Sequence, residues 1–424
     1  MLLAFLLAMQ TASARDAPPV LQFPTTGLDD PAAYEGYTAR LYRDSRGNAV
    51  EIYIDGKTGR VVHLWADALN ESIGFTVRKA AADTTAADTT AVGEAAVAFG
   101  EGKASVWSTG ARRSLLYSLT VPGGRTTQIG HFLLGSMRVE RDFGYAGRVN
   151  DPIDAPTFVP QEFTQLAERL DSVYTRRLTP MFAVTPSTWR VRVIQPSLDG
   201  KNRLALSLTG DARLSRVSLR DRVVTVRPRG AEPLTIAVEI TTDGAPLTPL
   251  TRTQIFDTAF LRFADSAQSQ RLERELRGVE LLSSKQKLMA GLPTYATYFG
   301  RDMLMTALLM EPVWSDTMAE FVMGAALAKL SPDGEVSHEE ALGGQAIREN
   351  AAEFLRTGDS TLLKNLQATR ENYWMVDDDF QLPVVAGHYF ADATVPDTRK
   401  QRFVTRWGAA LRKNLAYVAR QAAP

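Results

Sequence analysis

Apolar and polar residues alternate with a period of two through most of the first half of the chain. Such alternation is typical of strands that bury one face. Many short antiparallel strands bury their apolar faces by pairing into two packed sheets. We therefore expect an antiparallel β-sandwich over residues 20–240. The runs that carry the pattern are 36–43, 48–55, 60–67, 104–109, 113–121, 126–134, 188–196, 203–210, 221–228 and 234–242.

Turn residues between these runs predict which strands are neighbours. The stretch DGKTG at 55–59 separates two alternating runs and predicts a hairpin, and PGG at 122–124 predicts another. One helix is expected inside this region, at 160–178, because apolar residues recur there at helical spacing.

The pattern changes to helical spacing after a stretch rich in Thr, Pro and Gly. We interpret residues 241–255 as a linker and residues 256–424 as a second domain built from helical hairpins. In this domain Ser315 is a candidate N-cap. Helices are predicted at 271–289, directly after Arg301, and at 315–330, 343–358, 380–390 and 405–421.

The first 14 residues, MLLAFLLAMQTASA, are an apolar run followed by small residues. The run is too short to span a bilayer, and Ala12 and Ala14 are spaced as in a signal-peptidase site. No Lys or Arg precedes the run, which departs from the usual signal pattern. The sequence predicts a signal peptide at 1–14 and export to the periplasm or the medium.

Composition narrows the class of partner. The chain has 424 residues, of which 45% are hydrophobic and 23% charged, as is ordinary for a globular protein. Lys and Arg number 48, and Asp and Glu also number 48. This balance gives no global field to attract nucleic acid or an anionic membrane, whereas a neutral sugar is compatible with it. Cysteine is absent and there are only four histidines, so the sequence predicts no disulfide and no metal centre or cofactor.

One stretch, 285–341, concentrates turn residues, aromatic residues and charge directly before an apolar helix. Loops that hold polar groups in fixed places have this composition. A purely structural role, in which Asp302 caps the helix and Arg301 pairs with it, explains the spacing equally well. The residues concerned are Gly291, Pro293, Tyr295, Tyr298, Gly300, Arg301 and Asp302.

The string AGLPTYATYFGRDMLMTALLM resembles a motif of the bacterial glycogen-debranching and amylo-α-1,6-glucosidase-like proteins, which belong to the six-hairpin glycosidases. GEVSHEE at 334–340 and YWMVDDDFQLPVVAGHYF at 373–390 are similar to two later motifs of that family. The three motifs cover the last third of the chain. This resemblance implies an (α/α)6 toroid preceded by a β-sandwich, and activity on α-glucosides or related oligosaccharides.

Hydrolysis of an acetal needs a proton donor for the leaving oxygen and a second carboxylate. The consecutive acids Asp377, Asp378 and Asp379 are candidates, because mutual repulsion can raise the pKa of one of them. Exposed acidic triplets at helix starts are also common. The resemblance implies that the general acid is Asp377 or Asp379. It also implies that substrate is bound by Arg301, Asp302, His338 and Glu339, with Tyr295 and Tyr298 as stacking walls.

The second carboxylate of the family lies late in the toroid. At about 30 residues per hairpin, residues 256–424 hold only part of twelve helices. The sequence therefore predicts a partial toroid that lacks the base, with weak or absent hydrolysis. Two other classes stay open: a carbohydrate-binding protein without catalysis, and a polysaccharide lyase. The balanced charge argues against a lyase, which must bind uronate carboxylates.

Overall fold

Contacts divide the chain into two compact units, unit 1 (Met1–Pro246) and unit 2 (Leu247–Pro424). The predicted signal peptide, the predicted helix at 160–178 and most of the predicted helix at 343–358 lie outside the described residues. The computed structural model describes residues 20–21, 37–43, 49–55, 59–65, 72–79, 98–99, 104–109, 112–136, 180–196, 203–220, 222–243, 250–285, 288–291, 295, 298–341, 353, 357–359 and 370–423.

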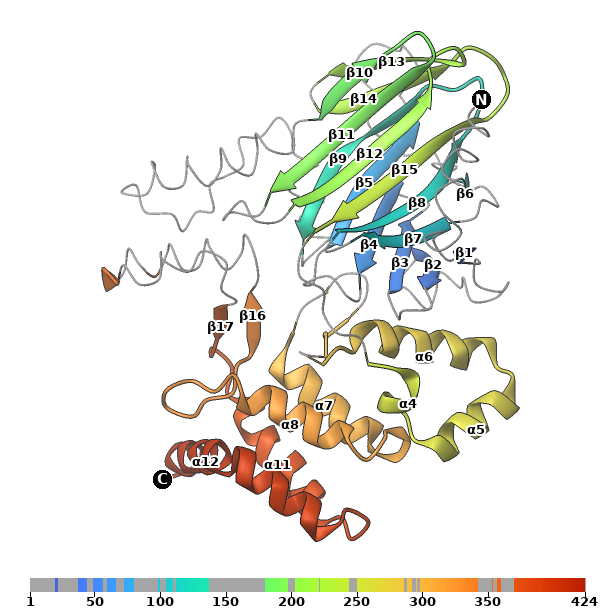
Figure 1. The fold of residues 1–424 in the computed structure, drawn as a ribbon. Helices are drawn as coiled ribbons and strands as arrows, with labels where there is room; N and C mark the ends of the chain where they lie inside the picture. The colour runs from blue at the N-terminus through green and yellow to red at the C-terminus, as the bar shows by residue number, and fades with distance from the viewer. Residues whose placement is uncertain are drawn as a thin grey trace. The chain divides into compact units, whose positions relative to one another are not determined.

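The strands of unit 1 form two antiparallel sheets (Figure 1). The first sheet has the order β1 (Val20–Leu21), β7 (Ala104–Thr109), β8 (Arg112–Val121), β15 (Leu234–Thr242), β12 (Arg203–Asp211), β11 (Thr188–Pro196) and β10 (Met181–Val184), and β6 (Ala98–Phe99) also pairs with β8. The second sheet has the order β13 (Ser215–Arg220), β14 (Val223–Pro228), β9 (Thr127–Ser136), β5 (Ser72–Lys79), β4 (Arg60–Trp65), β3 (Ala49–Asp55) and β2 (Tyr37–Arg43).

The two sheets bury one common apolar cluster. Ile52, Phe75 and Ile129 reach it from the second sheet, and Leu115 and Val238 reach it from the first. Strand β15 shows how alternate residues reach this core. Leu234, Ile236 and Val238 are buried, whereas Thr235 is exposed and Ala237 is half-buried. The alternation therefore predicted most of the antiparallel strands of this unit, but not β1, β5, β6, β10 and β13.

The turn at 122–124 was predicted wrongly as a hairpin. Strand β8 belongs to the first sheet and β9 to the second, so the turn carries the chain between sheets. Gly124 has φ +67 and its N–H donates to the carbonyl of Gly230 at 2.9 Å. A Cβ on Gly123 would lie 2.0 Å from the carbonyl oxygen of Ala231. The glycines are needed for this close contact with the loop before β15, rather than for a tight hairpin.

Unit 2 is helical, with a short two-stranded sheet. Helices α7, α8 and α11 pack around an apolar core that includes Met303, Leu304, Val322 and Leu382 (Figure 1). A closed toroid is not defined by the described residues. The elements are α4 (Arg252–Ile255), α5 (Thr258–Ala267), α6 (Gln270–Leu282), α7 (Gly300–Met310), the 3-10 helix η4 (Glu311–Val313), α8 (Met318–Leu327), β16 (Glu339–Ala341), β17 (Arg370–Asn372), α11 (Asp377–Ala391) and α12 (Asp397–Gln421).

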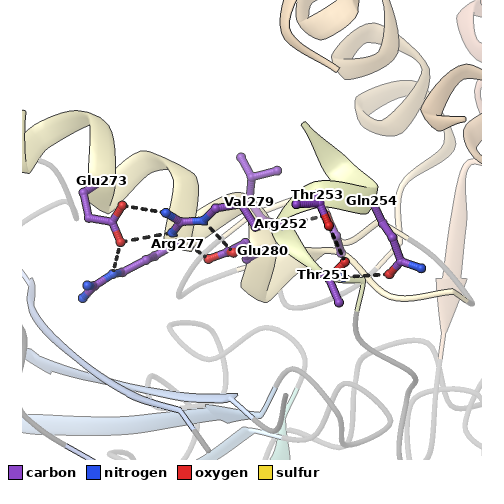
Figure 2. A network of polar contacts seen from close by, with 9 residues as sticks. Thr251, Arg252, Thr253, Gln254, Glu273, Arg277, Val279 and Glu280 are labelled. Carbon is purple, nitrogen blue, oxygen red and sulfur yellow. Dashed lines mark hydrogen bonds and ion pairs between the residues drawn. The ribbon is translucent and has the colours of Figure 1, made fainter. Parts of the chain in front are cut away.

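Both ends of the predicted linker 241–255 belong to regular structure, because β15 continues to Thr242 and α4 begins at Arg252. Figure 2 shows how α4 is held against α6. The Arg252 guanidinium bonds to Glu273 and Glu280, each at 2.9 Å at closest. Burial alone would lower the pKa of Arg252, but these two carboxylates outweigh it and raise that pKa. This network fixes the start of the helical unit.

Helix α8 begins later than predicted. It starts at Met318 after Thr317, and no side chain caps it. The hydroxyl of Ser315, the predicted cap, donates instead to the carbonyl of Gln254 at 2.6 Å, which ties the start of α8 to α4. Within the described residues, no helix combines the length and the apolar character needed to cross a membrane.

Candidate functional site

The start of α7 lies against the segment that carries His338. The N–H of Gly300 donates to the carbonyl of His338 at 2.8 Å, and Phe299 forms an isolated bridge with Glu339. A Cβ on Gly300 would lie 2.2 Å from the carbonyl oxygen of Ser337. Only glycine permits this approach, which explains the residue ahead of the Arg-Asp pair.

The first turn of α11 meets the same place from a third segment. Asp377 pairs with Arg301 at 3.7 Å, and Asp378 contacts His338 at 3.3 Å from Oδ2 to Nδ1. Asp379 Oδ1 accepts a hydrogen bond from the Val336 N–H at 2.6 Å. The three motifs, separated by up to about 80 residues in sequence, are thus joined by direct contacts.

Helices α7 and α11 lie side by side and run in the same direction (Figure 1). Arg301 and Asp377 join their beginnings, while Glu311 and His388, 3.4 Å apart, join the far ends. The N-termini of α7 and α11 therefore lie beside the same charged side chains, Arg301 and Asp377. Each helix N-terminus carries a partial positive charge.

The three aspartates differ sharply in exposure. Asp377 has 46% of its side chain exposed, whereas Asp378 and Asp379 are 0% and 1% exposed. The prediction treated all three as candidates for the catalytic acid. In this structure only Asp377 can reach a bound molecule, because the other two point into the protein and hold the segment 336–338.

Burial raises the pKa of both inner carboxyls, Asp378 and Asp379. Removal from water raises the pKa of Asp379 to about 6, although the hydrogen bond from Val336 opposes this change. Removal from water also raises the pKa of Asp378, and the proximity of His338 acts in the opposite direction. Neighbouring carboxylates in the triplet add to both increases. The repulsion anticipated from the sequence is present, but it is smaller than the effect of burial.

Arg301 and Asp302 lie at the surface on the first turn of α7, and each has 40% of its side chain exposed. The two side chains are 3.7 Å apart, so they pair as the structural alternative expected. Asp302 does not cap α7, whose N-cap is Phe299 without a side-chain hydrogen bond. Both polar groups remain accessible to a ligand.

The two tyrosines have different environments. Tyr295 is 48% exposed and packs edge-on against Phe299, with ring centroids 6.1 Å apart. Tyr298 is fully buried in the helical core, with its hydroxyl unpartnered among the described residues. Burial raises the pKa of Tyr298 above its ordinary value. The prediction of a stacking wall is wrong for Tyr298, which is a core residue, and stays open for Tyr295.

Glu339 is part of a strand rather than of a loop. It pairs with Asn372 in the β16–β17 ladder and is 5% exposed. Its position contradicts a direct contact with substrate in this structure. His338, directly before it, is 15% exposed and meets Phe299 edge-on at 5.3 Å between ring centroids.

One exposed aromatic residue was missed. Trp374 is 83% exposed and lies three residues before Asp377. Its neighbours are anchored, since the Tyr373 hydroxyl donates to the Lys329 carbonyl at 2.9 Å and Asn372 is paired in β17. A tryptophan three residues before the acidic triplet, inside the motif at 373–390, was the available signal in the sequence. Such a ring offers a flat apolar face.

Among the described residues, no group of three or more His, Asp or Glu side chains is arranged to hold a metal ion.

The sequence matches no protein-family model and no curated protein. A solved structure titled "Putative kojibiose phosphorylase from human microbiome" is similar to this chain with a TM-score of 0.26 and 7% identity. The match covers 87% of this chain and 46% of that one, so the present chain spans less than half of it. A TM-score this low does not establish a common fold.

Proposed function

We propose that unit 2 binds a saccharide where α7 and α11 both begin, beside Arg301 and Asp377. We propose that it does so as part of a glycoside hydrolase that acts on α-glucosides or related oligosaccharides. The observation that supports this most is the meeting of three sequence motifs through the contacts of Asp377 with Arg301 and of Asp378 with His338. Each motif resembles one of the debranching and glucosidase-like family, and these contacts are what a shared substrate site requires.

The accessible groups suit a neutral polyol. Arg301 offers several N–H donors in a plane, while Asp302 and Asp377 offer acceptors, so adjacent hydroxyls can be bound in pairs. Tyr295 and Trp374 offer apolar ring faces to the C–H side of a pyranose. The site combines few fixed polar groups with aromatic surface, as small-molecule sites do.

In the proposed hydrolysis, Asp377 gives its proton to the leaving glycosidic oxygen as the bond from that oxygen to the anomeric carbon breaks. Water adds to the anomeric carbon and loses a proton to a second carboxylate, which is the group that the sequence predicts to be lacking. Asp378 and Asp379 act indirectly, because they fix the segment that carries His338. A second candidate function is saccharide binding without turnover. The burial of Asp378 and Asp379 favours it, since it removes two of the three predicted acids from contact with a substrate.

The wider organisation is part of the same proposal. We infer a signal peptide at 1–14, a β-sandwich domain at 20–240, a linker within 241–255 and a partial (α/α)6 toroid at 256–424, in a periplasmic or secreted protein. The common core of the two sheets supports the sandwich, and the side-by-side packing of α7 and α11 is compatible with hairpins of a toroid.

Binding of α-linked glucose disaccharides, measured by calorimetry, tests the proposal. Arg301→Ala and Asp377→Asn should each weaken binding by about tenfold or more, because each removes a charge-assisted hydrogen bond. Matched controls are Arg402→Ala and Asp397→Asn on α12. Asp397, like Asp377, is an exposed acid at the first position of a helix. The controls should bind as the unaltered protein does.

The products of incubation separate the classes. Reducing sugar released from α-glucosides, and lost in Asp377→Asn, indicates hydrolysis. Binding without product indicates the second candidate. An unsaturated, ultraviolet-absorbing product from uronate polymers would show a lyase and refute the proposal. The proposal also fails if no α-glucoside binds, or if the control variants weaken binding as much as the site variants do.

A further inference from the structure

His338 contacts Asp378 through Nδ1, and the carboxyl of Asp378 is fully buried. We propose that the two residues form a proton-accepting dyad, in which Asp378 holds the ring as the Nδ1–H tautomer and leaves Nε2 to accept a hydrogen bond from a saccharide hydroxyl. The identity of the ligand rests on the proposed function, whereas the state of the ring does not. Asp378 is a positioning residue here, because it acts through His338.

His338 is held through its backbone and through its ring. Its backbone N–H donates to the carbonyl of Asn372 at 2.8 Å, and its carbonyl accepts from the Gly300 N–H at 2.8 Å. The ring meets Phe299 edge-on. The backbone contacts with β17 and with the start of α7 fix the segment that carries His338, while Phe299 and Asp378 contact the ring itself.

Asp378 is placed to control the proton on that ring. Its Oδ2 lies 3.3 Å from Nδ1, and its side chain is fully buried. Its second oxygen, Oδ1, is buried and has no hydrogen-bond partner among the described residues. A buried carboxylate needs a donor, and His338 is the side chain that supplies one.

Gly300 makes the close approach of Asp378 to the segment of His338 possible. A Cβ on Gly300 would come within 3.3 Å of Asp378 Oδ2 as well as 2.2 Å of the Ser337 carbonyl. Glycine at the first position of α7 therefore leaves the space in which the carboxylate meets the ring. A larger residue would push the start of α7 away from the segment of His338.

The choice of tautomer follows from the partners. An ionised carboxylate can only accept, so Nδ1 must carry the proton. In a neutral imidazole the other nitrogen then has a free lone pair and accepts. The same arrangement orients histidines in hydrolase triads and in metal sites, where a carboxylate fixes the ring and the second nitrogen does the chemistry.

Nitrogen-15 NMR of the imidazole rings tests the dyad without any ligand. Only four histidines are present, and the signal of His338 is assigned by its loss in His338→Phe. At a pH where the ring is neutral, the unaltered protein should show Nδ1 protonated. Asp378→Ala should shift the ring to the Nε2–H form, while Asp379→Asn, one residue away, should leave it unchanged.

A ring found as Nε2–H in the unaltered protein overturns the proposal, and this measurement requires only the assignment variant His338→Phe to fold. Disaccharide affinity gives the second arm, in which His338→Phe keeps the aromatic contact with Phe299 and should lose about tenfold. Unchanged affinity would remove the ligand role of Nε2. If no disaccharide binds at all, the proposed function fails, and the ring measurement still decides whether the dyad exists.

Discussion

Replacing Asp379 by Asn isolates the effect of one buried charge. The side chain is 1% exposed, and burial raises its pKa from 3.8 to about 6. The folded protein therefore binds this proton more tightly than the unfolded chain does. The stability from this group is complete below about pH 4 and is lost as the pH rises to about 6. A gap of about 2 pKa units corresponds to roughly 3 kcal/mol of unfolding free energy.

Asn cannot ionise, yet its carbonyl oxygen can still accept the Val336 N–H bond that Asp379 accepts at 2.6 Å. Asp379→Asn should match the unaltered protein near pH 4 and exceed it by up to about 3 kcal/mol above pH 7. Hydrogen exchange of peptides from α11, corrected for the pH dependence of chemical exchange, reports the stability of unit 2 separately. Asp397→Asn, an exposed acid on α12, is the control. A gap that does not grow with pH, or that grows in the control, would refute the reasoning.

Three further changes test other parts of the description. Gly300→Ala should destabilise unit 2 by about 2 kcal/mol or more in denaturant unfolding and abolish saccharide binding, because its Cβ would lie 2.2 Å from the Ser337 carbonyl. Tyr298→Phe should leave binding unchanged and raise stability by up to about 1 kcal/mol, because the lost hydroxyl is buried and unpartnered among the described residues. Burial lowers the pKa of His63 from 6.5 to about 4, so unit 1 should lose about 3 kcal/mol as the pH falls from 6.5 towards 4. Amide exchange in β4, corrected for the pH dependence of chemical exchange, should show this loss as lower protection.

The sequence predicted most of the longer strands of unit 1, but it missed β13, whose burial alternates along Ser215–Arg220. Strand β5 escaped because residues 73–77 are all buried and its pairing with β9 is irregular at Gly74. Alternation is a weaker guide where both faces are covered, although β12 keeps it. The turn at 122–124 was misread for a different reason. Glycines there permit contact with Ala231, and a local pattern cannot distinguish that need from a hairpin.

The candidate site could be located from sequence, but its internal geometry could not. Consecutive residues on a helix point about 100° apart, so three adjacent aspartates on the first turn of α11 must face three directions. Which of Asp377, Asp378 and Asp379 faces solvent depends on the neighbours of the helix. The segment of His338 and the start of α7 cover the inner side and leave Asp377 outside. Tyr298 was misplaced similarly, because an aromatic residue beside a turn suits a core and a binding surface equally.

A structural role explains the burial of Asp379 but not that of Asp378. Asp379 holds the segment 331–338, which Asn414 and Tyr417 on α12 also hold through Gly334 and Glu335, so its burial has a sufficient structural reason. Asp378 has no comparable reason, because it leaves one buried oxygen unpartnered among the described residues and directs the other to a partly exposed imidazole. Carboxylates buried at such expense cluster at functional sites. A functional role is therefore expected for the pair of Asp378 with His338 and for the pair of Asp377 with Arg301. The tautomer of the His338 ring tests the first pair, which no packing requirement explains.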